Sequence, residues 1–254
     1  MDRDTDKDWE RVAQASPYWG VLSVDKFQGV TLDDATLQEF FSSGERLIGN
    51  IFGVVSRYVD PKFRPVRSLD FGCGVGRLLV PLSKLCAEVV GVDVSPRMLE
   101  VCADHRGRFG VSNVSLVRGD DDLAAVEGKF DFVNSYIVMQ HIPPRRGFHL
   151  LERLMQLLKP GGSISIQLTY GKARRYLQHE ISRARFYRRE GNAIYDLAAI
   201  DKPAVEGTIT MYDYDLNNVF AIMSQYCGGQ IVCLPTFDDG HLGVHILAQR
   251  KPVD

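Results

Sequence analysis

The chain has 254 residues, of which 45% are hydrophobic and 24% charged, and its formal net charge at pH 7 is −2. This length and composition permit one globular domain with an appendage and a sizeable core. The near-neutral charge gives no general case for nucleic-acid binding. The charged start does not resemble a signal peptide, and no apolar run is long enough for a membrane span.

The five cysteines are dispersed along the chain, without a Cys-x-x-Cys pair and without the spacing of a metal site. We therefore expect free thiols in a reducing cytoplasm and no bound metal. Because no apolar run is long enough for a span, we also expect no membrane association.

Residues 1–64 are expected to form an N-terminal helical cap. The first eight residues are expected to fray because they are charged and terminal. One helix is predicted to begin at Asp33–Asp34, and a second to run over about 44–58 after a turn at Ser43–Gly44, because apolar residues recur there at helical spacing. These helices either cover an edge of the sheet or close over a ligand.

A strand over 66–71 leads into a turn that contains Gly72, Gly74 and Gly76, and a helix is predicted to begin at Arg77. Glycines at alternate positions let the backbone approach a ligand closely, and the helix start offers free N–H groups. A dinucleotide-binding turn would need its third glycine one place later, where this chain has Arg77.

The next predicted strand, 88–93, ends in an acidic residue, and acidic residues follow the one after it, 114–118. Asp93 is placed to accept hydrogen bonds from ribose hydroxyls. A carboxylate after the third strand can accept from the amine of adenine while a neighbouring backbone N–H donates to the ring. The alternative is that Asp120, Asp121 and Asp122 only favour the start of a helix through their negative charge.

The spacing Asp70-x-Gly72-x-Gly74-x-Gly76 resembles the first motif of the class I S-adenosylmethionine-dependent methyltransferases. The likeness extends over about 66–167 and includes Gln140-His141-Ile142, which is similar to the small-molecule members. It also includes the Lys-Pro-Gly-Gly sequence at 159–162, between the fourth predicted strand, 130–136, and the fifth, 163–168. Neither an Asn-Pro-Pro-Tyr nor a Pro-Cys motif is present, which argues against a base-flipping enzyme.

The resemblance implies that the cofactor is S-adenosylmethionine and that the product is S-adenosylhomocysteine. It assigns Asp120 to the adenine amine, the backbone N–H of Asp121 to the ring, and Asp70 to the amino end of methionine. The other cofactor-binding residues that it implies are Gly72, Cys73, Gly74, Gly76, Asp93, Val94, Met98, Ser135, Tyr136 and Gln140. His141 is either a general base, since its free pKa suits neutral pH, or a residue that orients the loop.

Residues 170–212 form an insertion after the fifth strand and carry a cluster of basic and aromatic side chains. At that edge of the sheet they would overhang the substrate. We expect either a lid that selects an anionic or sugar-like acceptor, or a solvated basic helix or dimer contact. Tyr170 and His241 are weaker candidates for the pocket mouth and for catalysis. The cluster comprises Lys172, Arg174, Arg175, Arg183, Arg185, Arg188 and Arg189, with Tyr176, Phe186 and Tyr187.

A helix over 214–226 and two strands over 230–234 and 244–248 complete the predicted fold. We expect an α/β fold in which a seven-stranded, mostly parallel sheet has helices on both faces and an antiparallel C-terminal hairpin. The methyltransferase domain would span 65–254. The expected activity is methyl transfer to a small-molecule acceptor, with oxygen preferred over nitrogen. Alternatives are an RNA or protein methyltransferase, an inactive binding protein and, least favoured, a dinucleotide oxidoreductase.

Overall fold

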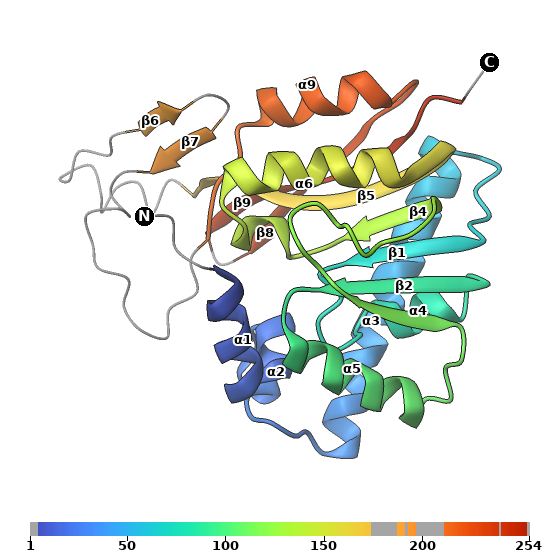
Figure 1. The fold of residues 1–254 in the computed structure, drawn as a ribbon, viewed down its shortest axis with the longest axis vertical. Coiled ribbons are helices and arrows are strands. Elements are labelled where there is room, and N and C mark those ends of the chain that lie inside the picture. The colour runs from blue at the N-terminus through green and yellow to red at the C-terminus, as the bar shows by residue number, and fades with distance from the viewer. Residues whose placement is uncertain (1–4, 174–186, 191–192, 197–210, 239, 253–254) are drawn as a thin grey trace.

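A computed structural model describes residues 5–173, 187–190, 193–196, 211–238 and 240–252 (Figure 1). No helix in these ranges is both long and apolar enough to cross a membrane. The helices, including short 3-10 and π turns, are α1 (Thr5–Ala15), α2 (Pro17–Val21), η1 (Asp25–Phe27), α3 (Asp34–Val54), η2 (Val55–Val59), α4 (Leu79–Ser83), α5 (Pro96–Arg108), η3 (Met139–His141), α6 (Pro144–Leu157) and α9 (Leu216–Tyr226). The strands are β1 (Arg67–Phe71), β2 (Glu88–Asp93), β3 (Val114–Arg118), β4 (Phe130–Ser135), β5 (Leu158–Lys172), β6 (Tyr187–Glu190), β7 (Ala193–Asp196), β8 (Val232–Asp238) and β9 (His241–Gln249).

The main sheet has seven strands in the order β3-β2-β1-β4-β5-β9-β8. The first five run parallel, whereas β9 pairs antiparallel with both β5 and β8. The order reverses between β1 and β4, which is where open α/β sheets bind their ligands at the carboxyl ends of the strands. The seven-stranded fold with an antiparallel C-terminal hairpin is confirmed.

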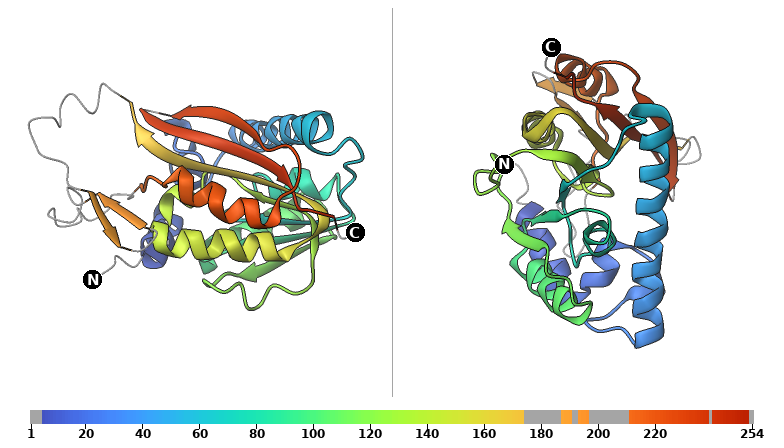
Figure 2. Two further views of the ribbon diagram at one scale, coloured as in Figure 1. Left: turned by 90° about the horizontal axis from the view of Figure 1, so that it is seen from above. Right: turned by 90° about the vertical axis from the view of Figure 1, so that its right-hand side faces the viewer.

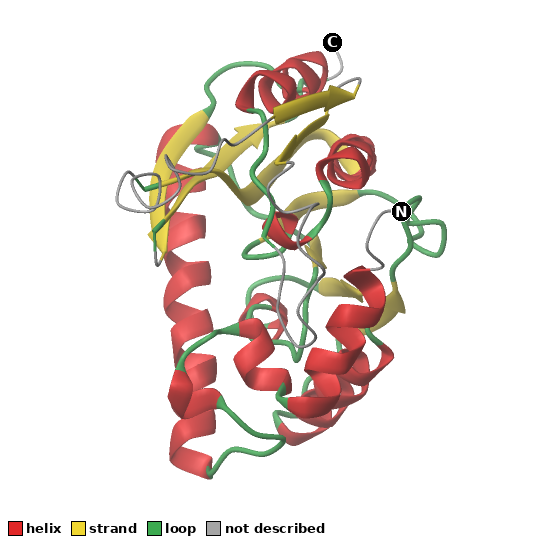
Figure 3. Cartoon of the chain, turned by 90° about the vertical axis from the view of Figure 1, so that its left-hand side faces the viewer, coloured by secondary structure: helices red, strands yellow, loops and turns green. Residues whose placement is uncertain are grey.

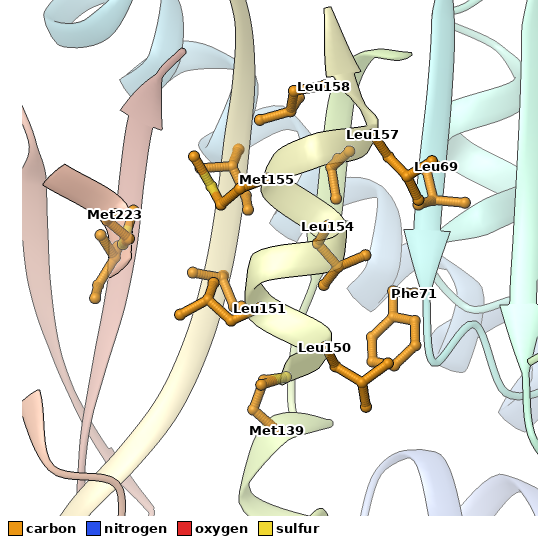
Figure 4. Packing of buried hydrophobic residues seen from close by; sticks show 14 of the residues in the cluster. Leu69, Phe71, Met139, Leu150, Leu151, Leu154, Met155, Leu157, Leu158 and Met223 are labelled. Carbon is orange, nitrogen blue, oxygen red and sulfur yellow. The ribbon is translucent and has the colours of Figure 1, made fainter. Parts of the chain in front are cut away.

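Two buried clusters pack on opposite faces of the sheet, because successive side chains of a strand point to opposite sides. Val89 belongs to the cluster with α3 and α4, and its neighbour Val90 belongs to the cluster with α6. Figure 4 shows the cluster that contains α6, in which Leu150 and Leu157 lie beside Phe71 and Leu69 of β1, while Leu151 and Met155 lie on the other side of the helix. The position of the carboxyl ends of the strands is thus fixed by packing on both faces.

Helix α3 is one continuous helix over 34–54, where the sequence predicted two helices separated at Ser43–Gly44. The upright helix in the right-hand view of Figure 2 is α3. A Cβ at Gly44 would lie 2.0 Å from the carbonyl oxygen of Arg77. Gly44 is therefore an interior helix residue that allows close contact with the turn after β1, and the predicted break is wrong.

Helix α1 forms where the sequence predicted fraying. It begins at Thr5, and its acidic Asp6 and Asp8 lie in the first turn, where negative charge is favourable. In Figures 1 and 3, α1 and α2 lie at the side of the sheet to which the parallel strands point, next to α5. The predicted fraying is corrected for residues 5–8 because long-range contacts, described below, hold α1 in place.

The insertion lies largely outside the described residues. Arg174, Arg175, Tyr176, Arg183, Arg185 and Phe186 belong to that part. The hairpin β6–β7 is described, and it pairs Tyr187 with Asp196. Lys172 forms an ion pair with Asp213, which joins the two ends of the insertion.

Candidate functional site

The turn after β1 is held against the end of β2. Gly72 and Cys73 both donate to the carbonyl oxygen of Val92, at 2.7 and 3.0 Å, and Gly72 and Gly74 have φ values of +74° and +51°. A Cβ at Gly72 would lie 2.3 Å from Val138 Cγ2, and one at Gly74 would lie 2.4 Å from Val21 Cγ2. The turn thus needs glycine both for its conformation and for its close neighbours.

Asp93 closes the turn from the end of β2. Its Oδ2 accepts from the backbone N–H of Gly74 at 2.8 Å, and its Oδ1 accepts from the backbone N–H of Ser95 at 2.9 Å. Burial raises the pKa of Asp93 to about 6, although the bonds from Ser95 and Gly74 favour the charged form. Each carboxylate oxygen keeps a lone pair, so the side chain can accept further hydrogen bonds.

A cavity of about 110 Å³, the first cavity, lies beside this turn. It is bounded by the carboxyl ends of β1, β2 and β3, by the loop after β4, and by α1. The residues selected from the sequence that line it are Gly72, Gly74, Asp93, Val94, Met98, Asp120, Asp121, Tyr136 and His141.

The loop between β4 and η3 forms one wall of the first cavity. Ile137 has a φ of +60°, a backbone conformation that a β-branched residue rarely adopts. The side-chain oxygen of Gln167 accepts from its backbone N–H at 3.0 Å. Strain of this kind persists where the surroundings fix it and gathers at functional sites.

Arg146 of α6 joins α1 to the acidic turn after β3. Its guanidinium donates to Asp121 at 2.6 to 3.0 Å, to Asp6 at 2.9 and 3.1 Å, and to Thr5 Oγ1 at 3.0 Å. Burial opposes the charge, but the bonds to Asp121 and Asp6 outweigh it and raise the pKa of Arg146. The carboxylate of Asp121 is therefore engaged by Arg146, which leaves its backbone for the predicted contact with a base.

Glu10 makes a second attachment between α1 and the rest of the fold. Its Oε2 accepts from Ser95 Oγ at 2.7 Å and from the backbone N–H of Arg97 at 3.2 Å, at the start of α5. Ser95 is the residue before α5, and its Oγ in turn accepts from the backbone N–H of Met98, which caps that helix. Helix α1 is thus attached at both sides of the first cavity.

Four cofactor candidates lie outside both cavities that border the loop after β4: Asp70, Cys73, Gly76 and Ser135. Asp70 is 2% exposed, and burial raises its pKa to about 7. It accepts from Asn134 Nδ2 at 2.8 Å. Any contact of Asp70 with a ligand would be indirect or would need a shift of the turn.

The bond to Asp70 begins a chain of buried polar side chains across β1, β4, β5 and β9. Asn134 accepts from Ser165 Oγ at 2.9 Å, and Ser165 lies 2.8 Å from His245 Nε2. Since the single hydroxyl proton of Ser165 is donated to Asn134, His245 must donate from Nε2. Burial lowers the pKa of His245 to about 4, so that the ring is neutral at pH 7.

A larger cavity of about 350 Å³, the second cavity, lies on the other side of the loop after β4. It shares Tyr136 and Ile137 with the first cavity. The candidates Gln140 and His241 line it, whereas Tyr170 is 39% exposed and lines neither cavity. Its other lining residues are Leu22, Ser43, Leu47, Arg77, Gln167, Thr169, Met211, Thr236 and Phe237.

Trp9, Asp6 and Arg146 line the first cavity but were not predicted from the sequence. A helix-spaced pattern at Trp9, Val12 and Ala13 was available in the sequence as a sign of α1. No local signal identifies Arg146, because its partner Asp6 is 140 positions away in the chain.

Comparison with known proteins is consistent with this geometry. Residues 69–162 match the family described as "Methyltransferase domain". A ubiquinone biosynthesis O-methyltransferase of Cereibacter sphaeroides is 37% identical over 100 residues, which are 39% of this chain and 40% of that protein. The match thus spans about two fifths of the length of such relatives.

Two solved structures share the fold over nearly the whole chain. One is magnesium protoporphyrin IX methyltransferase from Synechocystis PCC 6803 with bound S-adenosylhomocysteine, with a TM-score of 0.60, 16% identity and coverage of 92% of this chain and 93% of that one. The other is the N-methyltransferase NodS from Bradyrhizobium japonicum WM9 in complex with S-adenosylhomocysteine, with a TM-score of 0.60, 12% identity and coverage of 98% and 99%.

Proposed function

We propose that this chain, in which residues 69–162 match a methyltransferase domain, transfers a methyl group from S-adenosylmethionine to a small-molecule acceptor. Oxygen is the preferred acceptor atom. Loss of the methyl group converts the cofactor to S-adenosylhomocysteine, and the proposed reaction uses no metal.

The observation that carries this proposal is the convergence of three successive strand ends on the first cavity. β1 brings Gly72 and Gly74, β2 brings Asp93, and the turn after β3 brings Asp120. Glycine backbone that approaches a ligand, a carboxylate with free lone pairs and a second acidic group suit the methionyl, ribose and adenine parts of the cofactor in that order. The residues that line the first cavity therefore fit S-adenosylmethionine.

The sulfonium of S-adenosylmethionine supplies an activated methyl group, so the protein mainly has to position the acceptor and exclude water. Helix α1, attached through Arg146 and Glu10, covers the first cavity. His141 lines the same cavity and would receive the proton of an acceptor hydroxyl. A base is needed only where the acceptor arrives protonated.

Small-molecule O-methylation is supported by the relatives named ubiquinone biosynthesis O-methyltransferase. It is also supported by the second cavity, which shares two lining residues with the first and could admit an acceptor. The finer expectations, an anionic or sugar-like acceptor and a homodimer, remain part of the proposal. RNA or protein methylation and loss of turnover are the competing outcomes.

Isothermal titration with S-adenosylhomocysteine and, in parallel, NAD⁺ tests the cofactor. We expect binding of the adenosyl compound alone. Binding of NAD⁺ alone would overturn the proposal. Mass-spectrometric detection of methylated products in pools of hydroxylated small molecules then tests the reaction. Methylation of RNA or protein alone would show that the acceptor is a macromolecule and would overturn the small-molecule assignment.

Asp93→Ala gives the proposal a residue-level test. Removal of a charged acceptor should weaken S-adenosylhomocysteine binding by about 1–3 kcal/mol. Asp104→Asn is the matched control, because Asp104 is exposed on α5 and lines neither cavity. Equal affinities of the two variants would contradict the role of Asp93.

A further inference from the structure

The second cavity contains a buried positive charge. Arg77 is 5% exposed and lines this cavity. Its Nη1 lies 3.3 Å from Ser43 Oγ, while its Nε has no hydrogen-bond partner. The contact between its carbonyl oxygen and Gly44 fixes the backbone from which the side chain extends.

The charge of Arg77 is not neutralised by a direct ion pair with any carboxylate in the described ranges. Asp70 attracts it electrostatically, but the pKa of Asp70 is raised to about 7 and its Oδ1 accepts from Asn134. Taking an ionised group out of water without a partner is unfavourable. A guanidinium in this position therefore favours an anion in the cavity, and it can bind a carboxylate through two parallel hydrogen bonds.

A second polar group with an unmet requirement faces the same cavity. Gln140 is 3% exposed, and its Oε1 has no hydrogen-bond partner. The backbone carbonyl oxygen of Gln140 accepts from the backbone N–H of Tyr212 at 2.7 Å, which holds the residue in place. A buried acceptor of this kind requires a donor, such as a hydroxyl group.

The remaining walls are mixed, because Ser43, Gln167, Thr169, Thr236 and His241 line the cavity beside apolar side chains. Leu22, Leu47 and Met211 contribute aliphatic surface, and Tyr136 separates the second cavity from the first. A ligand that satisfies Arg77 and Gln140 carries an anionic group and at least one hydroxyl, on a body that can contact the apolar side chains of the cavity.

We propose that the second cavity binds the methyl acceptor and that this acceptor is a hydroxylated carboxylic acid, with its carboxylate on Arg77 and its hydroxyl donating to Gln140. This inference rests on the proposed function and adds the class of acceptor. It makes Arg77 the residue that selects anionic acceptors over neutral ones.

The test uses 3,4-dihydroxybenzoate and its neutral amide, 3,4-dihydroxybenzamide, titrated into the full-length protein saturated with S-adenosylhomocysteine. We expect the acid to bind at least tenfold more tightly than the amide. Equal binding, or no binding of the acid, would overturn the proposal. This comparison needs no variant, so it does not depend on the folding of one.

Arg77→Met and Arg77→Lys then assign the preference to the side chain. We expect the methionine variant to lose the preference for the acid and the lysine variant to keep part of it. Both should bind S-adenosylhomocysteine within twofold of the wild type. Arg46→Met is the control, because Arg46 is exposed on α3, the helix that also carries Ser43.

Two results separate this inference from the proposed function. If Arg77→Met weakens S-adenosylhomocysteine binding tenfold, the guanidinium holds the carboxylate of the cofactor, and the acceptor assignment is wrong while the proposed function stands. If the wild type does not bind S-adenosylhomocysteine, the proposed function itself fails.

Discussion

Trp9 of α1 lies edge-on against His141 of η3, with 4.8 Å between the ring centroids and 68° between the ring planes. The two residues are 132 positions apart, and both line the first cavity. One comes from the N-terminal cap and the other from the loop after β4. The contact therefore links closure of the cap to the position of the candidate base.

Trp9→Ala should weaken S-adenosylhomocysteine binding about 2- to 10-fold, because an aromatic pair contributes about 0.5–1.5 kcal/mol beyond its buried area. Isothermal titration measures the change. Trp19→Ala, in α2 and outside both cavities, serves as the control. Unchanged affinity in Trp9→Ala would mean that α1 does not close over the ligand.

His141→Gln separates a base from a residue that only orients the loop. As a base, His141 contributes about 10²- to 10⁴-fold to turnover, so kcat should fall by that factor while S-adenosylhomocysteine affinity stays within twofold. His149→Gln is the control, since His149 is exposed on α6 and contacts Asp122. A normal kcat in His141→Gln would mean that His141 only orients the loop after β4.

Arg146→Met should release α1, because a single guanidinium contacts both Asp6 and Asp121. We expect a faster dissociation of S-adenosylhomocysteine, measured by stopped-flow fluorescence, and a gain in protease cleavage within residues 5–15. The neighbouring Arg145 is exposed, so Arg145→Met should behave as the wild type. Identical dissociation rates in the two variants would exclude Arg146 as the attachment of α1.

Asp70→Asn should change how stability depends on pH. The folded chain keeps the proton of Asp70 up to about pH 7, whereas an unfolded chain releases it near pH 4. Between these values the folded state binds more protons, so the contribution of Asp70 to the free energy of unfolding falls as pH rises.

Asparagine cannot lose a proton, so Asp70→Asn should gain stability relative to the wild type between about pH 4 and pH 7, at most about 1.4 kcal/mol per pH unit. Urea unfolding across this range measures the difference. Asp104→Asn on the exposed face of α5 should run parallel to the wild type. A constant difference between Asp70→Asn and the wild type would show that the carboxyl group is already ionised at pH 4.

Gly44→Ala and Gly49→Ala form a matched pair on α3. A Cβ at Gly44 would meet the carbonyl oxygen of Arg77 at 2.0 Å, whereas one at Gly49 would meet nothing within 4 Å. The first should cost about 1–3 kcal/mol through overpacking, and the second should gain about 0.5–1 kcal/mol of helix stability. The midpoints of urea unfolding distinguish them, and a stable Gly44→Ala would show that α3 moves away from the turn at little cost.

The sequence predicted the sheet well because each strand carries its own signal. β1 is marked by the buried apolar residues Leu69 and Phe71, β4 by Phe130, Phe132 and Val133, and Asp93 stands at the end of β2, as expected. The division of α3 was predicted wrongly, because Ser43–Gly44 has the composition of a turn. The need for Gly44 comes from Arg77, which is remote in the sequence.

Side-chain partners across the fold could not be predicted, because no local pattern encodes them. Arg77 served in the sequence only to exclude a dinucleotide motif, and its burial beside Ser43 follows from the packing of α3. The division of the candidate residues between two cavities likewise depends on the path of the loop after β4.

The polar chain from Asp70 through Asn134 and Ser165 to His245 also bears on how the sheet assembles. Its members come from four strands that are neighbours in space but distant in sequence. A shift of one residue in any of these strands would turn its polar side chain to the other face and leave its neighbours buried without partners. The chain of hydrogen bonds thus penalises misaligned pairing among β1, β4, β5 and β9, and it fixes the glycine turn after β1 relative to the loop after β4.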